Sequence, residues 1–94
     1  MDTAYKCRYN NSLMHITFDS AKQATNQTKH GYDFADLDMG FFDRSTVVPA
    51  RGGRLMAIGR FGDTIITVIF RPLGSEAVSI ISMRDASLKE RSLL

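Results

Sequence analysis

The sequence predicts an α+β fold in which a four-stranded antiparallel sheet, arranged as a meander, has its helices packed on one face. Two observations predict this class. Residues 45–84 alternate apolar and polar side chains between short glycine-containing connections, as antiparallel strands do. Residues 19–41 carry the start and stop signals of helices. No repeat or linker interrupts the chain, so we expect a single domain over residues 14–94 with one small core.

The strands are predicted from the turns between them. Gly62-Asp63 suits a two-residue hairpin loop, because a glycine at its first position can adopt a positive φ. Gly52-Gly53 and Gly74-Ser75 suit two further two-residue connections. Pro49 cannot donate a ladder hydrogen bond, so its segment should be an edge strand. The predicted strands are residues 45–51, 54–61, 64–71 and 77–84.

Alternation along these strands divides the sheet into an uncharged face and a basic face. The uncharged face, expected to form the core, holds Thr46, Val48, Ala50, Leu55, Ala57, Gly59, Phe61, Thr64, Ile66, Val68, Phe70, Ala77, Ser79, Ile81 and Met83. The other face holds all five arginines of these strands, Arg51, Arg54, Arg60, Arg71 and Arg84. Its remaining residues are Ser45, Val47, Pro49, Met56, Ile58, Ile65, Thr67, Ile69, Val78, Ile80 and Ser82. Like charges on one face repel, so such a cluster favours an anionic partner, and phosphate is the natural candidate. Single arginines could instead pair with nearby carboxylates or extend from strand ends into water.

The clearest helix covers residues 20–30, with Asp19 as its N-cap and Gly31 as its C-cap. Lys22, Asn26 and Lys29 recur on one side of this helix, a stripe that is often simply solvated surface.

Two shorter helices are also expected. Asp33 and Asp36 resemble a capping box before the core-spaced Phe34, Leu37 and Phe41. Asp85 can cap a last helix, ASLKERSLL, which is too short to persist unless Leu88 docks onto the domain.

Charge, cysteine content and histidine spacing limit the partners, the location and the cofactors expected of the protein. The net charge of +2 is too small to indicate a polyanion partner by itself. Cys7 is the only cysteine, which fits a reducing, cytoplasmic location, and no apolar run is long enough for a membrane span. His15 and His30 lack ligand spacing, so no metal or other cofactor is expected.

Residues 1–13 show no periodicity and are expected to be a mobile extension. A strand, MHITF, is expected to follow and to lie beside the sheet or cover one of its edges.

Several of these residues together resemble the BrnT toxin family over residues 14–91. The resemblance is carried by Phe18-Asp19, Lys22, Asn26, Lys29-His30-Gly31, Phe34, Arg54, Ala57-Ile58-Gly59, Ile80-Ile81-Ser82-Met83-Arg84, Ala86 and Glu90-Arg91. Members often have tryptophan where this chain has Phe18, and a more charged middle segment than the one around Gly40.

The resemblance implies a RelE-like fold and the toxin of a type II toxin-antitoxin system. Such a toxin is an endoribonuclease that inhibits translation by cutting RNA, and a BrnA-like antitoxin neutralises it. Operator DNA would be bound only through the complex with the antitoxin.

A metal-independent ribonuclease uses the 2′-hydroxyl of the RNA as nucleophile and leaves a 2′,3′-cyclic phosphate, so the protein must move protons and stabilise charge on phosphorus. Arginine suits the second task and histidine the first, because imidazole exchanges protons near neutral pH. The candidate catalytic residues are Arg84, Arg54, Glu90 and His30. The candidate RNA-binding residues are Arg51, Arg60, Arg71, Lys22, Lys29 and Arg91.

Other interpretations of these residues stay open. His30 could stabilise the end of its helix, and Glu90 could be an ion-pair partner of Arg84 or Arg91. The whole basic face could belong to a non-catalytic module that binds RNA or an acidic protein. The RNA-binding module is disfavoured because the predicted basic face has no aromatic side chain on which bases could stack.

Overall fold

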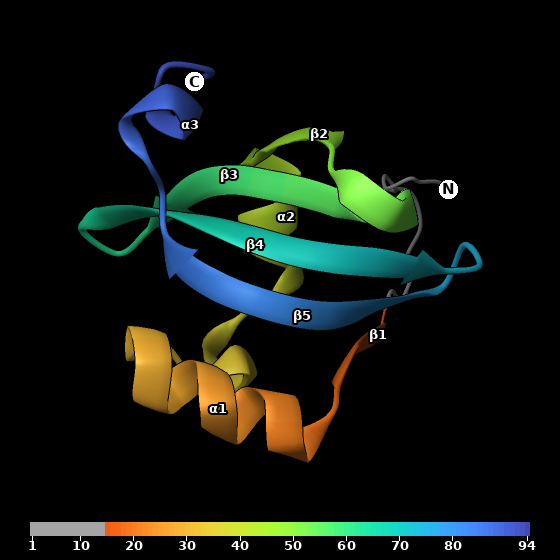
Figure 1. Cartoon of the computed structure of the whole chain (residues 1–94). Helices are drawn as coiled ribbons and strands as arrows, with labels where there is room; N and C mark the ends of the chain where they lie inside the picture. The colour runs from red at the N-terminus through yellow and green to blue at the C-terminus, as the bar shows by residue number, and fades with distance from the viewer. Residues whose placement is uncertain (1–14) are drawn as a thin grey trace.

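The computed structural model describes residues 15–94 and shows one sheet with helices on both sides (Figure 1). The elements in chain order are β1 (His15–Phe18), α1 (Ser20–His30), the 3-10 turn η1 (Phe34–Asp36), α2 (Met39–Arg44), β2 (Thr46–Pro49), the 3-10 turn η2 (Arg51–Gly53), β3 (Leu55–Phe61), β4 (Thr64–Leu73), β5 (Ala77–Asp85) and α3 (Leu88–Arg91). The expected extension, residues 1–13, lies outside the described residues.

The strand order is β1-β5-β4-β3-β2, and β1 runs parallel to β5. The α+β class and the meander from β2 to β5 are confirmed, and β2 is an edge strand, as its proline predicted. The prediction of a purely antiparallel four-stranded sheet is wrong, because β1 adds a fifth, parallel strand. The RelE-like fold implied by the resemblance stays a prediction.

The core lies between the sheet and the segment from η1 to α2. Phe34 and Phe41 are 0% and 1% exposed, and Leu37 is also buried. These three residues were predicted to face the core, but from one helix. The chain instead forms a 3-10 turn capped by Asp33 and then α2, which is capped by Asp38. Full burial of such side chains contributes roughly 1.5–3 kcal/mol each.

The hairpin at Gly62 has the predicted register, with Phe61 opposite Thr64, and Gly62 has a φ of 60°. The register of β2 is one residue away from the prediction. The turn Arg51–Gly53 uses three residues, so Val47 rather than Val48 pairs with Ala57. Arg51 therefore lies in a turn and does not face Arg54.

The last connection also has three residues, since Leu73 pairs with Ala77. This one-residue difference puts Val78 and Ile80 into the core, both 0% exposed, which corrects their predicted place on the basic face. A bulge then inserts Ile81 between the pairs that Ser82 and Ile80 make with β4. Together the two differences shift the register by two residues, so Arg84 pairs with Thr67 instead of Ile65. Because a shift of two residues restores the face, the side chains from Ser82 onward lie on their predicted faces.

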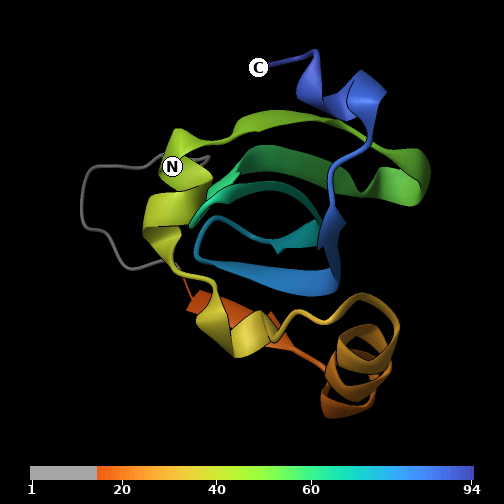
Figure 2. The ribbon, with the colours of Figure 1, turned by 90° about the vertical axis from the view of Figure 1, so that its left-hand side faces the viewer.

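Alternation and register place Arg54, Arg60, Arg71 and Arg84 on one side of the sheet, which we call the arginine face. Arg54 and Arg71 lie near one end of this face, and Arg60 lies near the other end. Figure 2 shows α2 on the core side of the sheet and α1 and α3 toward the opposite side. The prediction that the helices pack on one face is therefore wrong.

Helix α1 has the predicted limits and both predicted caps. It is attached to the edge of β5 where the pairing with β1 has ended. The side chain of Asn26, 5% exposed, donates to the carbonyl oxygen of Met83 at 2.9 Å and accepts from its amide nitrogen at 3.1 Å. Asn26 thus bonds to β5 as the backbone of a neighbouring strand would.

Helix α3 is not docked as predicted. Ser87, rather than Asp85, is its N-cap and forms a capping box with Glu90. Leu88 is 87% exposed, so the expected apolar docking is wrong. Within the part of the chain that is described, no helix is long and apolar enough to cross a membrane.

Replacing Asn26 with Ala should lower the free energy of unfolding by roughly 2 kcal/mol or more, because it leaves a buried N–H and a buried C=O without partners. Urea unfolding followed by circular dichroism measures this change. Thr28→Ala, at an exposed position of the same helix, is the matched control and should change stability by less than about 0.5 kcal/mol. Equal stability of the two variants would show that the contact with Met83 is dispensable.

Candidate functional site

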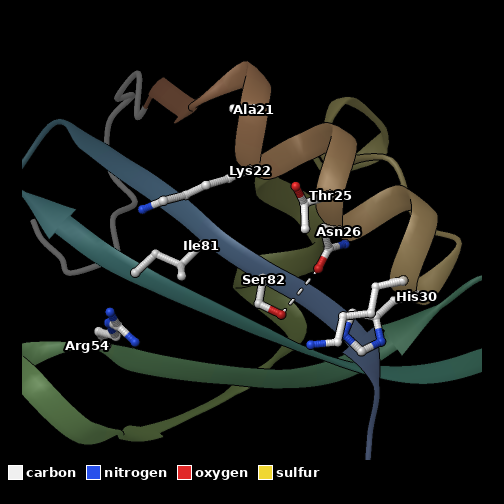
Figure 3. A pocket seen from close by; sticks show the side chains of 9 residues that line it. Ala21, Lys22, Thr25, Asn26, His30, Arg54, Ile81 and Ser82 are labelled. Carbon is white, nitrogen blue, oxygen red and sulfur yellow. Dashed lines mark hydrogen bonds between the residues drawn. The ribbon is translucent and has the colours of Figure 1, made fainter.

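A groove of about 410 Å³ lies on the arginine face, between α1 and the part of β5 that follows the bulge (Figure 3). It is lined by Ala21, Lys22, Thr25, Asn26, Lys29, His30, Arg54, Ile81 and Ser82. Helix α1 forms its wall and β5 part of its floor, while Arg54 lines it from the position just before β3. The groove therefore joins residues that are far apart in the sequence.

The stripe predicted on α1 is the wall of this groove. Lys22, Asn26 and Lys29 recur at helical spacing and all line the groove. Asn26 is the member that bonds to the sheet, so the two amines lie on either side of an anchored position. Asn26 is buried and is therefore not solvated surface, whereas Lys22 and Lys29 are exposed at the border of the groove.

The charge of the groove is positive. Lys22, Lys29 and Arg54 are exposed, and none of them forms an ion pair within residues 15–94. The groove has no acidic side chain among the residues that line it. Cations that lack a carboxylate partner attract an anion from solution, and a phosphate group accepts hydrogen bonds from arginine especially well.

Arg84 lies next to this groove on the same face, two residues after Ser82 along β5. Both terminal nitrogens of its guanidinium donate to the carboxylate of Glu90, each at 2.8 Å. The hydroxyl of Thr67 and the backbone N–H of Ser87 donate to the same carboxylate at 2.9 Å. Four hydrogen bonds thus hold Glu90 in place, and α3 is anchored by this polar contact instead of by Leu88.

The ion pair with Arg84 lowers the pKa of Glu90 from 4.5 to about 2, with the bonds from Ser87 and Thr67 acting in the same direction. Glu90 also raises the pKa of Arg84, so both groups stay charged near neutral pH. A carboxylate this acidic holds no proton to donate and is a weak proton acceptor. The geometry therefore favours Glu90 as a group that orients Arg84 over Glu90 as a general acid or base.

The other candidate residues lie outside the groove. Arg60 is exposed at the far end of β3, and Arg51 is exposed in the turn before that strand. Arg71 donates weakly to the carbonyl oxygen of Gly52, at 3.4 Å. Arg91 donates through Nε to the carbonyl oxygen of Ala86, at 3.2 Å. The structure thus gathers Lys22, Lys29, His30 and Arg54 in one place, and Arg84 with Glu90 beside it.

Sequence reasoning missed several residues that support the site. Thr67 and Ser82 were assigned to the correct face but given no role, and the bulge at Ile81 had no recognisable turn signal. Tyr32, just after α1, donates a hydrogen bond to Asp85, and this bond raises the pKa of the tyrosine hydroxyl. Within residues 15–94, no group of three His, Cys, Asp or Glu side chains has an arrangement that could hold a metal ion.

A basic groove on one face of the sheet, beside an arginine fixed by a carboxylate, defines a small α+β protein with a positively charged surface. Comparison with known protein families identifies the family. Residues 18–90 match the family described as "Ribonuclease toxin, BrnT, of type II toxin-antitoxin system". The match covers most of the chain, and the protein belongs to the BrnT family of toxins, as its sequence motifs indicated.

A solved structure supports this assignment. The chain is similar to the Brucella abortus ribonuclease toxin BrnT, with 57% sequence identity and a TM-score of 0.75. The similarity covers 79% of this chain and 97% of the Brucella chain. Comparison with curated proteins gives no match.

The carboxylate of Glu90 should make stability depend on pH. Because its pKa is lower in the folded protein than in the unfolded chain, its contribution is complete above about pH 5 and is lost as the pH falls toward 2. A shift of this size corresponds to at most roughly 3 kcal/mol. Urea unfolding at a series of pH values should show that Glu90→Gln loses the most stability, relative to the unchanged protein, at neutral pH and little near pH 2.

Glu76→Gln is the matched control, because Glu76 is exposed and its side chain makes no bond within residues 15–94. Its stability curve should run parallel to that of the unchanged protein. A Glu90→Gln curve that is also parallel over the whole range would contradict the role given to the ion pair.

Proposed function

We propose that this protein is a metal-independent endoribonuclease toxin that cuts RNA and thereby inhibits translation. The observation that carries the proposal is the fixed Arg84 beside a basic groove on one open face of the sheet. Membership of a family of ribonuclease toxins supports the same conclusion.

RNA would lie along the arginine face, with its phosphates bound by cations of the groove. Lys22, Lys29 and Arg54 are exposed side chains on flexible stems, so they can follow an irregular single strand. Arg51, Arg60 and Arg71 extend the basic surface beyond the groove, and Arg91 adds charge on the side of α3. These residues supply affinity that falls with salt, because each phosphate contact releases counterions.

The reaction begins when the 2′-oxygen of the RNA attacks the adjacent phosphorus and gives up its proton to a base. The bond from phosphorus to the 5′-oxygen then breaks, and that oxygen takes a proton from an acid. The products are a 2′,3′-cyclic phosphate and a 5′-hydroxyl. His30 lines the groove and can take part in one of these proton transfers, since imidazole both accepts and donates near neutral pH.

Arg84 would stabilise the charge that develops on the phosphorane oxygens. Its two terminal nitrogens already bond to Glu90, and Nη1 also donates to the carbonyl oxygen of Asp85 at 3.3 Å. These bonds fix the plane of the guanidinium and leave the Nε–H and the second N–H of Nη2 for the substrate. A donor that is held in place before the reaction costs no reorganisation when the charge appears. Glu90 thus acts through Arg84, which replaces its predicted role in proton transfer.

As a toxin of a type II system, the protein would be neutralised by a BrnA-like antitoxin, and the complex would bind operator DNA through the antitoxin. An antitoxin that covers the arginine face should present acidic or amide side chains to it. Burying several arginines without partners in an interface would cost several kcal/mol.

Cleavage of RNA by the purified protein should persist in excess EDTA, because the proposed proton transfers and charge stabilisation come from side chains alone. The new ends, analysed by mass spectrometry, should be a 2′,3′-cyclic phosphate and a 5′-hydroxyl. Activity that disappears in EDTA and returns with magnesium would refute the proposed mechanism.

Arg84→Ala should lower the single-turnover rate at saturating enzyme by on the order of a hundredfold or more, the loss typical of one transition-state donor. Arg51→Ala should weaken RNA binding. It should also lower the slope of the logarithm of the binding constant against the logarithm of the salt concentration by roughly 0.7 for each lost phosphate contact. Arg44→Ala is the control, because Arg44 is exposed at the end of α2, on the core side of the sheet.

Circular dichroism must first show that the three variants are folded. If Arg84→Ala cuts RNA at the parental rate, the assignment of Arg84 as a catalytic residue is wrong, and the arginine face serves only as a docking surface.

A further inference from the structure

The groove has two basic ends and a floor that is not basic. Figure 3 shows Lys22 and Arg54 toward one end, with Ile81 between them, and His30 toward the other end beyond Ser82. Lys29 precedes His30 in the last turn of α1. The α-carbons of Lys22 and Lys29 are separated by roughly 10 Å along the helix, so a strand running beside α1 can present separate phosphates to the two ends.

The floor of the groove, beside its Lys22 and Arg54 end, includes an isoleucine that the core does not use. Ile81 is the extra residue of the bulge, and it lines the groove while Ile80 and Met83 are fully buried in the core. A bulge commonly redirects a side chain in this way. The groove thus offers an apolar, branched side chain directly between cations.

Hydrogen-bonding groups lie next to this apolar floor. The hydroxyl of Ser82 contacts Asn26 at 3.3 Å, and Thr25 adds a second hydroxyl from α1. A bare phosphate would use the cations but would gain nothing from Ile81. A nucleotide uses all three features, because it joins phosphates to a flat base with an apolar face and polar edges.

We propose that the groove between α1 and β5 is a subsite for one unpaired nucleotide of RNA. Its base lies against Ile81, near the hydroxyls of Ser82 and Thr25, and its flanking phosphates lie at the two basic ends. This inference rests on the proposed function and adds the substrate class, which is single-stranded RNA. A paired base is stacked inside its helix and cannot enter the groove, so duplex RNA is excluded.

The test uses the full chain and two small probes. Adenosine 3′,5′-bisphosphate carries a base and two phosphates but no phosphodiester that could be cut, whereas inorganic pyrophosphate carries the charge without the base. Calorimetry at low salt should show that Ile81→Ala lowers the affinity for the bisphosphate by roughly tenfold, because the apolar contact with the base is lost. The affinity for pyrophosphate should not change. Ile65→Ala, which truncates a half-buried isoleucine of the same face outside the groove, should change neither.

Pyrophosphate binding also reports whether Ile81→Ala keeps its fold and a basic end that binds an anion. If Ile81→Ala lowers the affinity for both probes equally, or for neither of them, the subsite is overturned. Assays with single-stranded RNA separate this result from the proposed function. If the unchanged protein cuts RNA but Ile81→Ala binds the bisphosphate with unchanged affinity, the subsite alone is overturned. If the unchanged protein leaves RNA intact but Ile81→Ala selectively loses affinity for the bisphosphate, the subsite is supported and the proposed ribonuclease activity is overturned.

Discussion

The site depends on the two hydrogen bonds between the side chain of Asn26 and the backbone of Met83. They fix the distance from α1 to the sheet, and that distance determines the width of the groove. The amide suits this task because it is both donor and acceptor, as a strand backbone is. The bulge at Ile81 lies two residues before this contact, so the same stretch of β5 anchors the helix and directs an isoleucine into the groove.

A second polar contact organises the other side of the arginine face. Glu90 joins α3, β4 and β5 through its bonds to Ser87, Thr67 and Arg84. A helix of four residues with no buried side chain would not persist by itself, so this contact keeps the helix in place. The fold and the orientation of Arg84 are therefore supported by one network, and a change in one should be felt by the other.

Local signals allowed part of this to be predicted. Asp19 and Gly31 defined α1, and the Gly62 hairpin defined the register of β3 and β4. The other two turns were misjudged, because glycine pairs allow several loop lengths, and Gly52 and Gly53 both have positive φ in a three-residue turn. Arg84 was placed on the correct face only because the longer turn and the bulge together shift the register by two residues, which restores the face. The parallel pairing of β1, the bond from Asn26 to Met83 and the position of Glu90 arise from contacts that are distant in sequence, which no local pattern reports.

Covering the sheet edges has a consequence for self-association. Strand β5 would expose the N–H and C=O of Met83 beyond the end of β1, and Asn26 occupies both groups. At the opposite edge, the proline of β2 removes one donor. Free edge groups are templates for pairing between copies of a chain. The bonds that shape the groove therefore also remove two groups of β5 that another copy of the chain could pair with.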